Sequence, residues 1–263
     1  MDHCLIPDSR SLSPFFAMKR FFIKHVTCGT VRITGSDAKY IVNVLRMKAG
    51  DEMILFNGNG GEYLAEIKRA GTESVKVQIK SGYVPKPESS VEMTLAQGFL
   101  KDKKMDGLVR QVTELGIKGW VPFFAKRSVP RPNMERICAR MKRWDKIAKE
   151  ALKQCGRSWI TQIHTAVGFD RMLDMAKVCD LKIIFWENHG KPCCFEKLKD
   201  SHGTVKTIFA IIGPEGGLTL EEVDQAKECG FVTAGLGPRI LRAETATVAA
   251  CALLQYVFGD IGN

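Results

Sequence analysis

The sequence predicts a two-part α/β protein, in which a small amino-terminal β-barrel precedes a larger domain built on a mostly parallel sheet. Three observations lead to this prediction. Short runs with partial alternation of apolar and polar residues crowd residues 18–80, between glycine-rich turns. A stretch with the composition of a linker, GYVPKPESS, covers residues 82–90. After it, continuous apolar runs alternate with amphipathic stretches, which indicates strands buried on both faces between helices.

The amino-terminal part divides into a tail and a barrel. Residues 1–17 show no periodicity, and we expect a loose tail there. Barrel strands are expected over residues 18–81, in RFFIKHV, GTVRI, DEMILFN, EYLAEIK and VKVQIK, and one helix in DAKYIVNVLRMKAG. Between two of these strands lies FNGNGGEY, whose Asn-Gly pair is typical of a hairpin turn.

The second domain is expected over residues 91–263. Its strands are predicted in VEMTLAQGF, WVPFF, LKIIFW, TVKTIFAIIG and FVTAGLG. Its helices are predicted in KKMDGLVRQVTELG, over residues 135–155, from a capping box at Thr219 and Glu222 to Gly230, and over residues 244–258. The last helix is apolar on most sides and rich in alanine, so we expect it to be buried in a core or against a partner.

The charge points to a polyanionic partner. The chain of 263 residues carries a net charge of +10, and residues 91–160 hold 16 Lys and Arg against 7 Asp and Glu, a net +9. A basic surface concentrated in this way suits nucleic acid. Part of the basic helix, including Lys142 and Arg143, is expected to contact RNA, although a solvated face is the default for such a helix.

Composition excludes several other classes of protein. An apolar content of 45% argues against global disorder, and nine Cys are too few for a disulfide scaffold, so we expect reduced thiols in a cytoplasmic protein. We expect no membrane span, because no apolar run approaches about 18 residues. The first residues do not form a signal peptide. No metal is expected, since His189, Cys193 and Cys194 lack the usual ligand spacing.

Two glycine-rich loops follow predicted buried strands. The first is IIGPEGGLTLEEV, residues 211–223, and the second is AGLGPRILRAETATVAA, residues 234–250. Glycine lets the backbone approach a ligand closely, and ligands of parallel sheets lie beyond the carboxyl ends of the strands. Either loop alone is compatible with a tight turn. Together they predict one shared pocket, with apolar walls and main-chain groups that suit a flat ring.

These two motifs closely resemble the RsmE family of ribosomal RNA methyltransferases, in the SPOUT superfamily. The likeness continues in LAQGFLKDKKMDGLVRQVTELGI, FFAKRSV, RWDKIAKEALKQCGRS, MKRFFI and YIVNVLRMKAGDEMILFNGNGGEYLAEI. It spans about residues 18–258. The resemblance implies a PUA-like RNA-binding barrel and a SPOUT domain with a deep trefoil knot. It further implies S-adenosylmethionine as cofactor, a homodimer, and methylation of N3 of a uridine in the decoding region of 16S ribosomal RNA.

The resemblance also assigns site residues. The cofactor is expected to bind Trp186, Ile212, Gly213, Gly216, Gly217, Leu236, Gly237, Ile240 and Leu241. The RNA is expected to bind Arg20, Arg46, Arg127 and Arg157, in addition to Lys142 and Arg143.

The chemistry needs a base and a group that stabilises negative charge. Uridine N3 carries a proton that must leave, and arginine suits the charge that develops on the ring oxygens. Glu215, Glu244 and Arg242 are candidate catalytic residues, and the sequence does not say which of them is the base. Glu244 and Arg242 are equally expected to pair with each other. Two other functions stay open: ribose 2′-O methylation, and an RNA-binding assembly factor without catalysis.

Overall fold

The computed structural model describes residues 18–24, 29–83, 87–101, 103–129, 131–187, 198–199 and 203–262. The expected tail and the residues His189, Cys193 and Cys194 therefore lie outside the described part of the chain. The chain divides into two compact units, residues 1–86 and 87–263, which are described separately.

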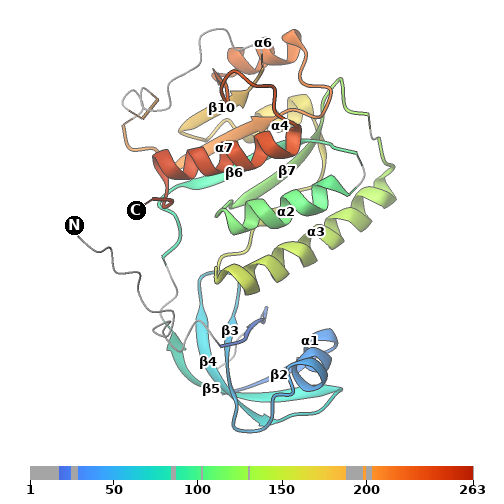
Figure 1. Ribbon diagram of the computed structural model, residues 1–263, viewed down its shortest axis with the longest axis vertical. Helices are drawn as coiled ribbons and strands as arrows, with labels where there is room; N and C mark the ends of the chain where they lie inside the picture. Colours follow the sequence, from blue (N-terminus) through green and yellow to red (C-terminus); the bar gives the residue numbers. More distant parts are fainter. Residues whose placement is uncertain are drawn as a thin grey trace, which may run out of the picture. The chain divides into compact units, whose positions relative to one another are not determined.

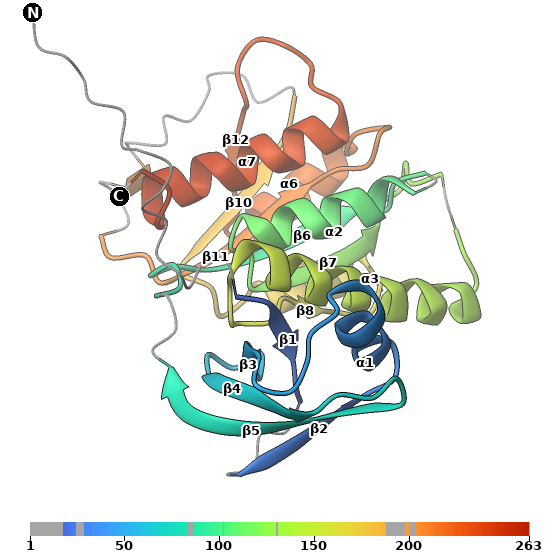
Figure 2. The same cartoon turned by 60° about the horizontal axis from the view of Figure 1, so that its bottom comes forward.

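The amino-terminal unit is a small, mainly antiparallel sheet (Figures 1 and 2). Its described strands run in the spatial order β1-β3-β4-β5-β2, and only the β1–β3 pair is parallel. The bounds are β1 Arg20–Phe22, β2 Thr30–Thr34, β3 Glu52–Phe56, β4 Glu62–Arg69 and β5 Ser74–Tyr83. Strand β5 thus includes the first two residues of the segment expected as a linker. Alternate side chains, such as Val31, Ile33, Val75 and Val77, form the core of this unit.

One helical segment and one hairpin match the local signals in the sequence. The predicted helix is present as two short pieces, α1 Ser36–Lys39 and the π-helical turn η2 Tyr40–Val44, which bury Ala38 and Ile41. The predicted hairpin joins β3 to β4, and the Asn57 side chain accepts hydrogen bonds from the amides of Asn59 and Gly61. This bonding closes the turn, as expected for an Asn-Gly signal.

The carboxy-terminal unit contains a seven-stranded sheet in which every described pairing is parallel. Its main order is β12-β10-β11-β6-β7-β8, and β9 also pairs with β7. The bounds are β6 Glu92–Gly98, β7 Gly119–Phe124, β8 Gln162–Ile163, β9 Val167–Gly168, β10 Leu181–Phe185, β11 Thr207–Ile212 and β12 Val232–Ala234. The predicted parallel α/β architecture is confirmed, and the knot stays a prediction.

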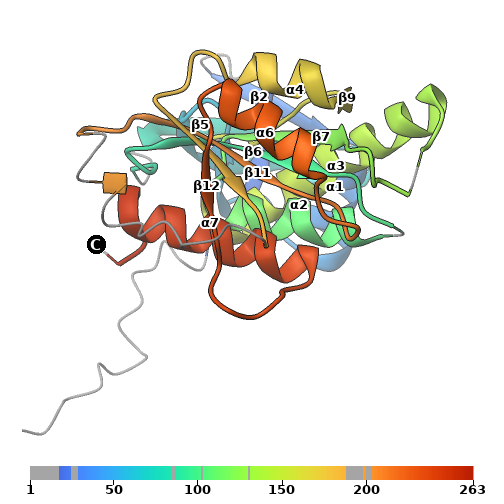
Figure 3. The ribbon, with the colours of Figure 1, turned by 90° about the horizontal axis from the view of Figure 1, so that it is seen from above.

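Helices cover both faces of this sheet (Figure 3). Helices α2 Lys104–Glu114, α3 Met134–Cys155 and α7 Ala243–Phe258 contribute to the core on one face, and α4 Phe169–Met175 and α6 Leu220–Glu228 to the core on the other. Successive residues of β11 therefore alternate between two apolar layers: Ile208 and Ala210 face the first, Phe209 and Ile211 the second. This two-sided burial is why the strands are continuous apolar runs.

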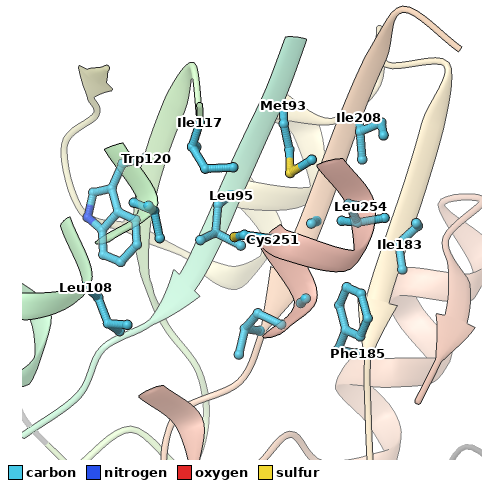
Figure 4. Close-up of a cluster of buried hydrophobic side chains, with 14 of the residues drawn as sticks. Met93, Leu95, Leu108, Ile117, Trp120, Ile183, Phe185, Ile208, Cys251 and Leu254 are labelled. Atoms are coloured by element: carbon cyan, nitrogen blue, oxygen red, sulfur yellow. The ribbon is translucent and has the colours of Figure 1, made fainter. Parts of the chain in front are cut away.

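Figure 4 shows the first of these cores, in which Cys251 and Leu254 of α7 pack among side chains of the sheet. Burial raises the pKa of the Cys251 thiol to about 12, so the group is an uncharged part of the core. The ends of α6 follow the predicted signals. Thr219 and Glu222 form the full capping box, and Gly230 follows the helix with φ +84°. None of the helices in the described ranges has the length and apolar content that crossing a membrane requires.

Candidate active site

A cavity of about 560 Å³ lies at the carboxyl ends of strands β10, β11 and β12. These strands are neighbours in the sheet, so the loops that follow them meet at one edge. The start of α2 and the start of α7 close the cavity. Its lining is Lys104, Phe185, Trp186, Glu187, Ile212, Gly213, Pro214, Glu215, Gly216, Gly217, Leu218, Leu236, Gly237, Pro238, Arg239, Ile240, Leu241, Arg242, Ala243, Glu244 and Ala246.

The first loop, residues 213–217, needs its glycines for steric reasons. The Gly217 amide donates to the Pro214 carbonyl at 2.9 Å, which closes a tight turn. Gly217 has φ +67°, and a Cβ there would lie 2.7 Å from Oε1 of Glu187. A Cβ on Gly98, at the end of β6, would lie 2.4 Å from the nitrogen of Pro214. Gly217 is therefore needed for its positive φ, and Gly98 because the backbone of the loop passes too close for a side chain.

A buried network of hydrogen bonds supports this loop. The Gln97 side-chain amide donates to the carbonyl of Gly213 at 3.2 Å, and its oxygen accepts from the Thr247 hydroxyl at 2.6 Å. Thr247 is also within 2.7 Å of the Ala243 carbonyl. Gln97 and Thr247 are fully buried. The network therefore joins the end of β6, the first loop and the first turn of α7, which fixes their relative positions.

The second loop, residues 235–242, offers an apolar wall. Gly237 has φ +93°, and Leu236 packs against the core beneath the loop. Ile240 is 89% exposed, although it lines the cavity. An exposed isoleucine beside a cavity gains from covering an apolar part of a ligand.

Charged side chains gather where α2, the first loop and α7 meet. The Lys104 ammonium lies 3.2 Å from Oε1 of Glu215 and 3.1 Å from Oε1 of Glu244. The Lys101 amide also donates to Oε1 of Glu215, at 3.1 Å. Hydrogen bonds to Glu244 and then Glu215 raise the pKa of Lys104, so this lysine is a permanent cation at neutral pH.

One oxygen of the Glu244 carboxylate is buried, although the side chain as a whole is 29% exposed. Oε2 of Glu244 is buried and has no hydrogen-bond partner among the described residues. Burial raises the pKa of Glu244, but bonds from its own backbone amide and from Lys104, with the charge of Arg242, outweigh burial and leave this pKa below its ordinary value. The carboxylate is therefore ionised at neutral pH, and its Oε2 has no donor among the described residues.

Trp186, which also lines the cavity, has a buried polar atom without a partner in the described part of the chain as well. Its indole nitrogen Nε1 is buried and has no acceptor among the described residues, while its ring lies 6.0 Å from the Lys227 ammonium. An indole N–H usually finds a partner when it is buried.

The structure brings the predicted pocket residues together. All nine residues expected to bind the cofactor line the cavity, and so do the candidate catalytic residues Arg242, Glu215 and Glu244. That they bind or catalyse stays a prediction. The sequence interpretation missed Lys104 as a site residue, because it treated this lysine as part of the general basic charge. Its place just after β6, beside β11 in the sheet, was the available signal.

The residues predicted to bind RNA are differently placed. In the amino-terminal unit, Arg46 is exposed and has φ +53°, the one positive value among the described non-glycine residues. Arg20 instead donates to Oε1 of the buried Glu62 at 2.7 Å, and its guanidinium lies 5.2 Å from the centre of the Phe56 ring. Arg20 therefore has a structural task within this unit.

The four predicted RNA-binding residues of the second unit divide in the same way. Arg127, Lys142 and Arg143 are exposed. Arg127 donates to the Gly216 carbonyl at 3.3 Å, so it lies at the rim of the cavity, and Arg143 pairs with Asp106 at 2.7 Å. Arg157 is only 12% exposed and pairs with Glu88, while it also donates to the Thr113 carbonyl at 2.5 Å. Arg157 thus secures the end of α3 within the fold.

Comparison with known proteins matches both units. Residues 87–255 match the model of an RNA methyltransferase domain, and residues 33–80 match the model of an RNA methyltransferase PUA domain. The ribosomal RNA small subunit methyltransferase E of Bacillus subtilis (strain 168) is 32% identical over 247 residues, which are 91% of this chain and 96% of that protein. The two matched models define the class: an RNA methyltransferase with an attached PUA domain.

Solved structures agree. A ribosomal RNA small subunit methyltransferase E from Neisseria gonorrhoeae, bound to S-adenosyl methionine, is 30% identical with a TM-score of 0.83, over 93% of this chain and 99% of that chain. A protein of Legionella pneumophila assigned as a methyltransferase, in complex with SAM, is 30% identical with a TM-score of 0.84 over the same shares. The chain belongs to the RsmE family of RNA methyltransferases. The resemblance found in the sequence is confirmed.

Proposed function

We propose that this protein transfers the methyl group of S-adenosylmethionine to N3 of a uridine in the decoding region of 16S ribosomal RNA. One observation carries the proposal: the loops after three adjacent parallel strands enclose a single cavity, and both family motifs line it. Two relatives with the same fold are known with S-adenosylmethionine bound.

The residues present fit this cofactor. The backbone of residues 213–217 approaches closely because it is glycine-rich, and Leu236 and Ile240 offer apolar surface to an adenine ring. Trp186 supplies a buried donor that has no partner among the described residues. The carboxylates of Glu187, Glu215 and Glu244 suit a ligand that carries a sulfonium and an ammonium. When bound, the cofactor supplies an electrophilic methyl group.

The target base is the finer part of the proposal. Methyl transfer to N3 requires an acceptor for the N3 proton and cations for the charge that moves onto the ring oxygens. Carboxylates and the cations Lys104, Arg239 and Arg242 line the same cavity. The PUA-type unit and the exposed basic residues of α3 are suited to hold the surrounding RNA through its phosphates.

Two alternatives make different demands on the site. Ribose 2′-O methylation would place the methyl group on the sugar instead of on the base. An assembly factor that only binds RNA would not require a cavity lined by two glycine-rich motifs.

The working unit in this proposal is a cytoplasmic homodimer. Helix α7 buries Cys251 and Leu254 against the sheet, yet Leu253 and Tyr256 on other sides are 37% and 66% exposed. The face bearing these residues would pack on the same region of a second copy. Sedimentation at micromolar concentration should give twice the monomer mass, and a monomer would contradict this part.

The experiment is a transfer assay with isotopically labelled S-adenosylmethionine. The acceptors are small ribosomal subunits and naked 16S RNA from a strain that lacks the modification, and the product is digested to nucleosides. We expect the label in 3-methyluridine. Label in a 2′-O-methyl nucleoside would replace the target. If no methyl group is transferred and calorimetry detects no cofactor binding, the remaining function is that of an assembly factor that only binds RNA.

A further inference from the structure

We propose that Glu244 is the group that takes the N3 proton of the target uridine, and that Lys104 both holds Glu244 for this step and stabilises the charge that moves onto a ring oxygen of the base. The inference rests on the proposed function and deepens it. It selects one base among the carboxylates of the cavity and adds a residue on a separate helix.

The two oxygens of the Glu244 carboxylate differ in their partners. Oε1 is held 3.1 Å from the Lys104 ammonium, whereas Oε2 is buried and has no donor among the described residues. A buried acceptor without a donor is unfavourable, so a small turn of the carboxylate toward a donor in the cavity is downhill. Uracil has one donor on its pairing edge, N3–H, which lies between the acceptors O2 and O4.

The Lys104–Glu244 pair matches the hydrogen-bonding edge of uracil. Lys104 is a donor and Glu244 an acceptor, and the two groups lie side by side at hydrogen-bond distance. A neighbouring donor and acceptor complement N3–H and one ring oxygen of uracil. The ammonium would then stabilise the negative charge that moves onto that oxygen as N3 loses its proton. Cytosine has no proton at N3, so this pair also discriminates against cytidine.

Glu215 and Glu244 differ in how their oxygens are held. The two side chains are about equally exposed, Glu215 at 27% and Glu244 at 29%, but Oε1 of Glu215 accepts from the Lys101 amide in addition to Lys104. Its Oε1 has two donors, so Lys104 and the backbone together fix it as a support. Oε1 of Glu244 pairs with Lys104, whereas its Oε2 has no hydrogen-bond partner among the described residues. The geometry therefore favours Glu244 as the acceptor and Glu215 as the second anchor for Lys104.

The charged groups that face this pair come from each surrounding segment. They are Lys104 from α2, Glu187 after β10, Glu215 from the first loop, and Arg239 and Arg242 from the second loop. A hydrogen bond from its own backbone, together with Lys104 and Arg242, keeps the pKa of Glu244 low and the group ionised at neutral pH, so it is ready to accept a proton before RNA arrives. Lys104 itself stays protonated and does not serve as the base.

The step balances as follows. Glu244 takes the N3 proton, and the electron pair of N3 forms the bond to the methyl carbon of S-adenosylmethionine. The bond from that carbon to sulfur breaks, and its electrons remain on sulfur. The products are 3-methyluridine, S-adenosylhomocysteine and protonated Glu244, which returns its proton to water.

The test uses single-turnover methyl transfer by the full-length protein with RNA from unmodified small subunits. Glu244→Gln should lower the rate about 10²- to 10⁴-fold, while its calorimetric affinity for S-adenosylmethionine stays within threefold of wild type. Between pH 6 and 8 the wild-type rate should be flat. The Glu244→Gln rate should rise about tenfold per pH unit, because only uracil that is already ionised can react.

Two further measurements separate loss of the base from damage to the fold. RNA containing 5-fluorouridine, whose N3–H is more acidic, should recover much of the Glu244→Gln rate. Glu221→Gln serves as the matched control, because Glu221 lies on α6 outside the cavity lining and pairs with Lys126. It should behave as wild type.

Lys104 is tested by its effect on Glu244. Lys104→Met should raise the pKa of Glu244, because the cation that stabilises its ionised form is removed. The acid limb of the rate profile should therefore move to higher pH, and Lys104→Arg should restore it. An unmoved limb in Lys104→Met would overturn the positioning role.

The remaining outcomes are equally decisive. A Glu244→Gln rate within threefold of wild type, equal losses on uridine and 5-fluorouridine RNA, or loss of cofactor affinity in parallel with rate would each overturn the assignment of the base. A large loss in Glu215→Gln alone would transfer the role to Glu215. Wild-type protein that forms no 3-methyluridine would instead remove the proposed function and this inference with it.

Discussion

The residues predicted to bind the cofactor and those predicted to bind RNA are placed differently by the structure. All nine residues predicted for the cofactor line one cavity, whereas Arg20 and Arg157, predicted for RNA, are bound within the fold by Glu62 and Glu88. The cavity is formed largely by backbone at the ends of adjacent strands. A glycine-rich motif in the sequence indicates the conformation of that backbone directly. A basic residue in the sequence shows only that a positive charge is present. Its partner can be a carboxylate of the same protein or a phosphate of the RNA. Charge therefore predicts a binding residue less well than backbone shape predicts a pocket.

The largest expected effect concerns Arg157 and stability. Arg157→Ala should lower the free energy of unfolding by about 2–4 kcal/mol, because it leaves the partly buried Glu88 carboxylate without its partner. Lys142→Ala, at an exposed site on α3, should stay within about 0.5 kcal/mol. Urea unfolding measures both. Equal, small effects would mean that Arg157 is free to serve the RNA, and the contrast drawn above would fail.

The next effect concerns the cavity. Gly217→Val should reduce the affinity for S-adenosylmethionine at least about tenfold, because a β-branched residue is strained at φ +67° and its Cβ would meet Glu187. Gly50→Val is the matched control, since Gly50 has φ +96° with open space around it in the other unit. It should cost stability and leave cofactor affinity unchanged. Calorimetry that finds equal affinity in both variants would remove the first loop from the site.

Smaller changes are expected on the basic surface of α3. Replacing Lys142, Arg143 and Lys146 by Ala should flatten the salt dependence of RNA binding. The slope of log K against log salt should fall by about 0.9 for each duplex phosphate that the protein no longer neutralises. Cofactor affinity should not change. Arg143 already pairs with Asp106, so Lys142 and Lys146 should carry most of the effect. If the slope stays at the wild-type value, this face is merely solvated.

The smallest effect in stability concerns Arg46. Arg46→Gly should change the free energy of unfolding by less than about 1 kcal/mol, because the relief of the left-handed backbone at φ +53° offsets the greater freedom of glycine in the unfolded chain. RNA affinity should nevertheless fall, since an exposed cation is removed. A destabilised variant with normal RNA affinity would reverse the assignment.

Local signals predicted the local features well. The capping box at Thr219 and Glu222 depends on four residues, and both hydrogen bonds are present. Burial on two faces made β10 and β11 recognisable as apolar runs. Periodicity could not show that the predicted amino-terminal helix would be a single turn followed by a π-helical turn, because both place apolar residues at similar spacing.

Features that depend on distant segments were beyond the sequence. Lys104 meets Glu215 and Glu244 only because α2, the first loop and α7 converge at one edge of the sheet. Arg157 meets Glu88 across 69 positions. In both cases the residue type was visible, but the partner was set by tertiary packing. An ion pair that crosses the fold leaves no spacing signal to detect.

The most direct test of the central claim is the 3-methyluridine content of 16S RNA in a strain lacking the modification. The strain is complemented either with this chain or with its Gly217→Val variant, at equal protein levels. The account predicts that the wild-type chain restores 3-methyluridine in the decoding region and that the variant restores little. An unmodified RNA with the wild-type chain, or full restoration by the variant, would contradict it.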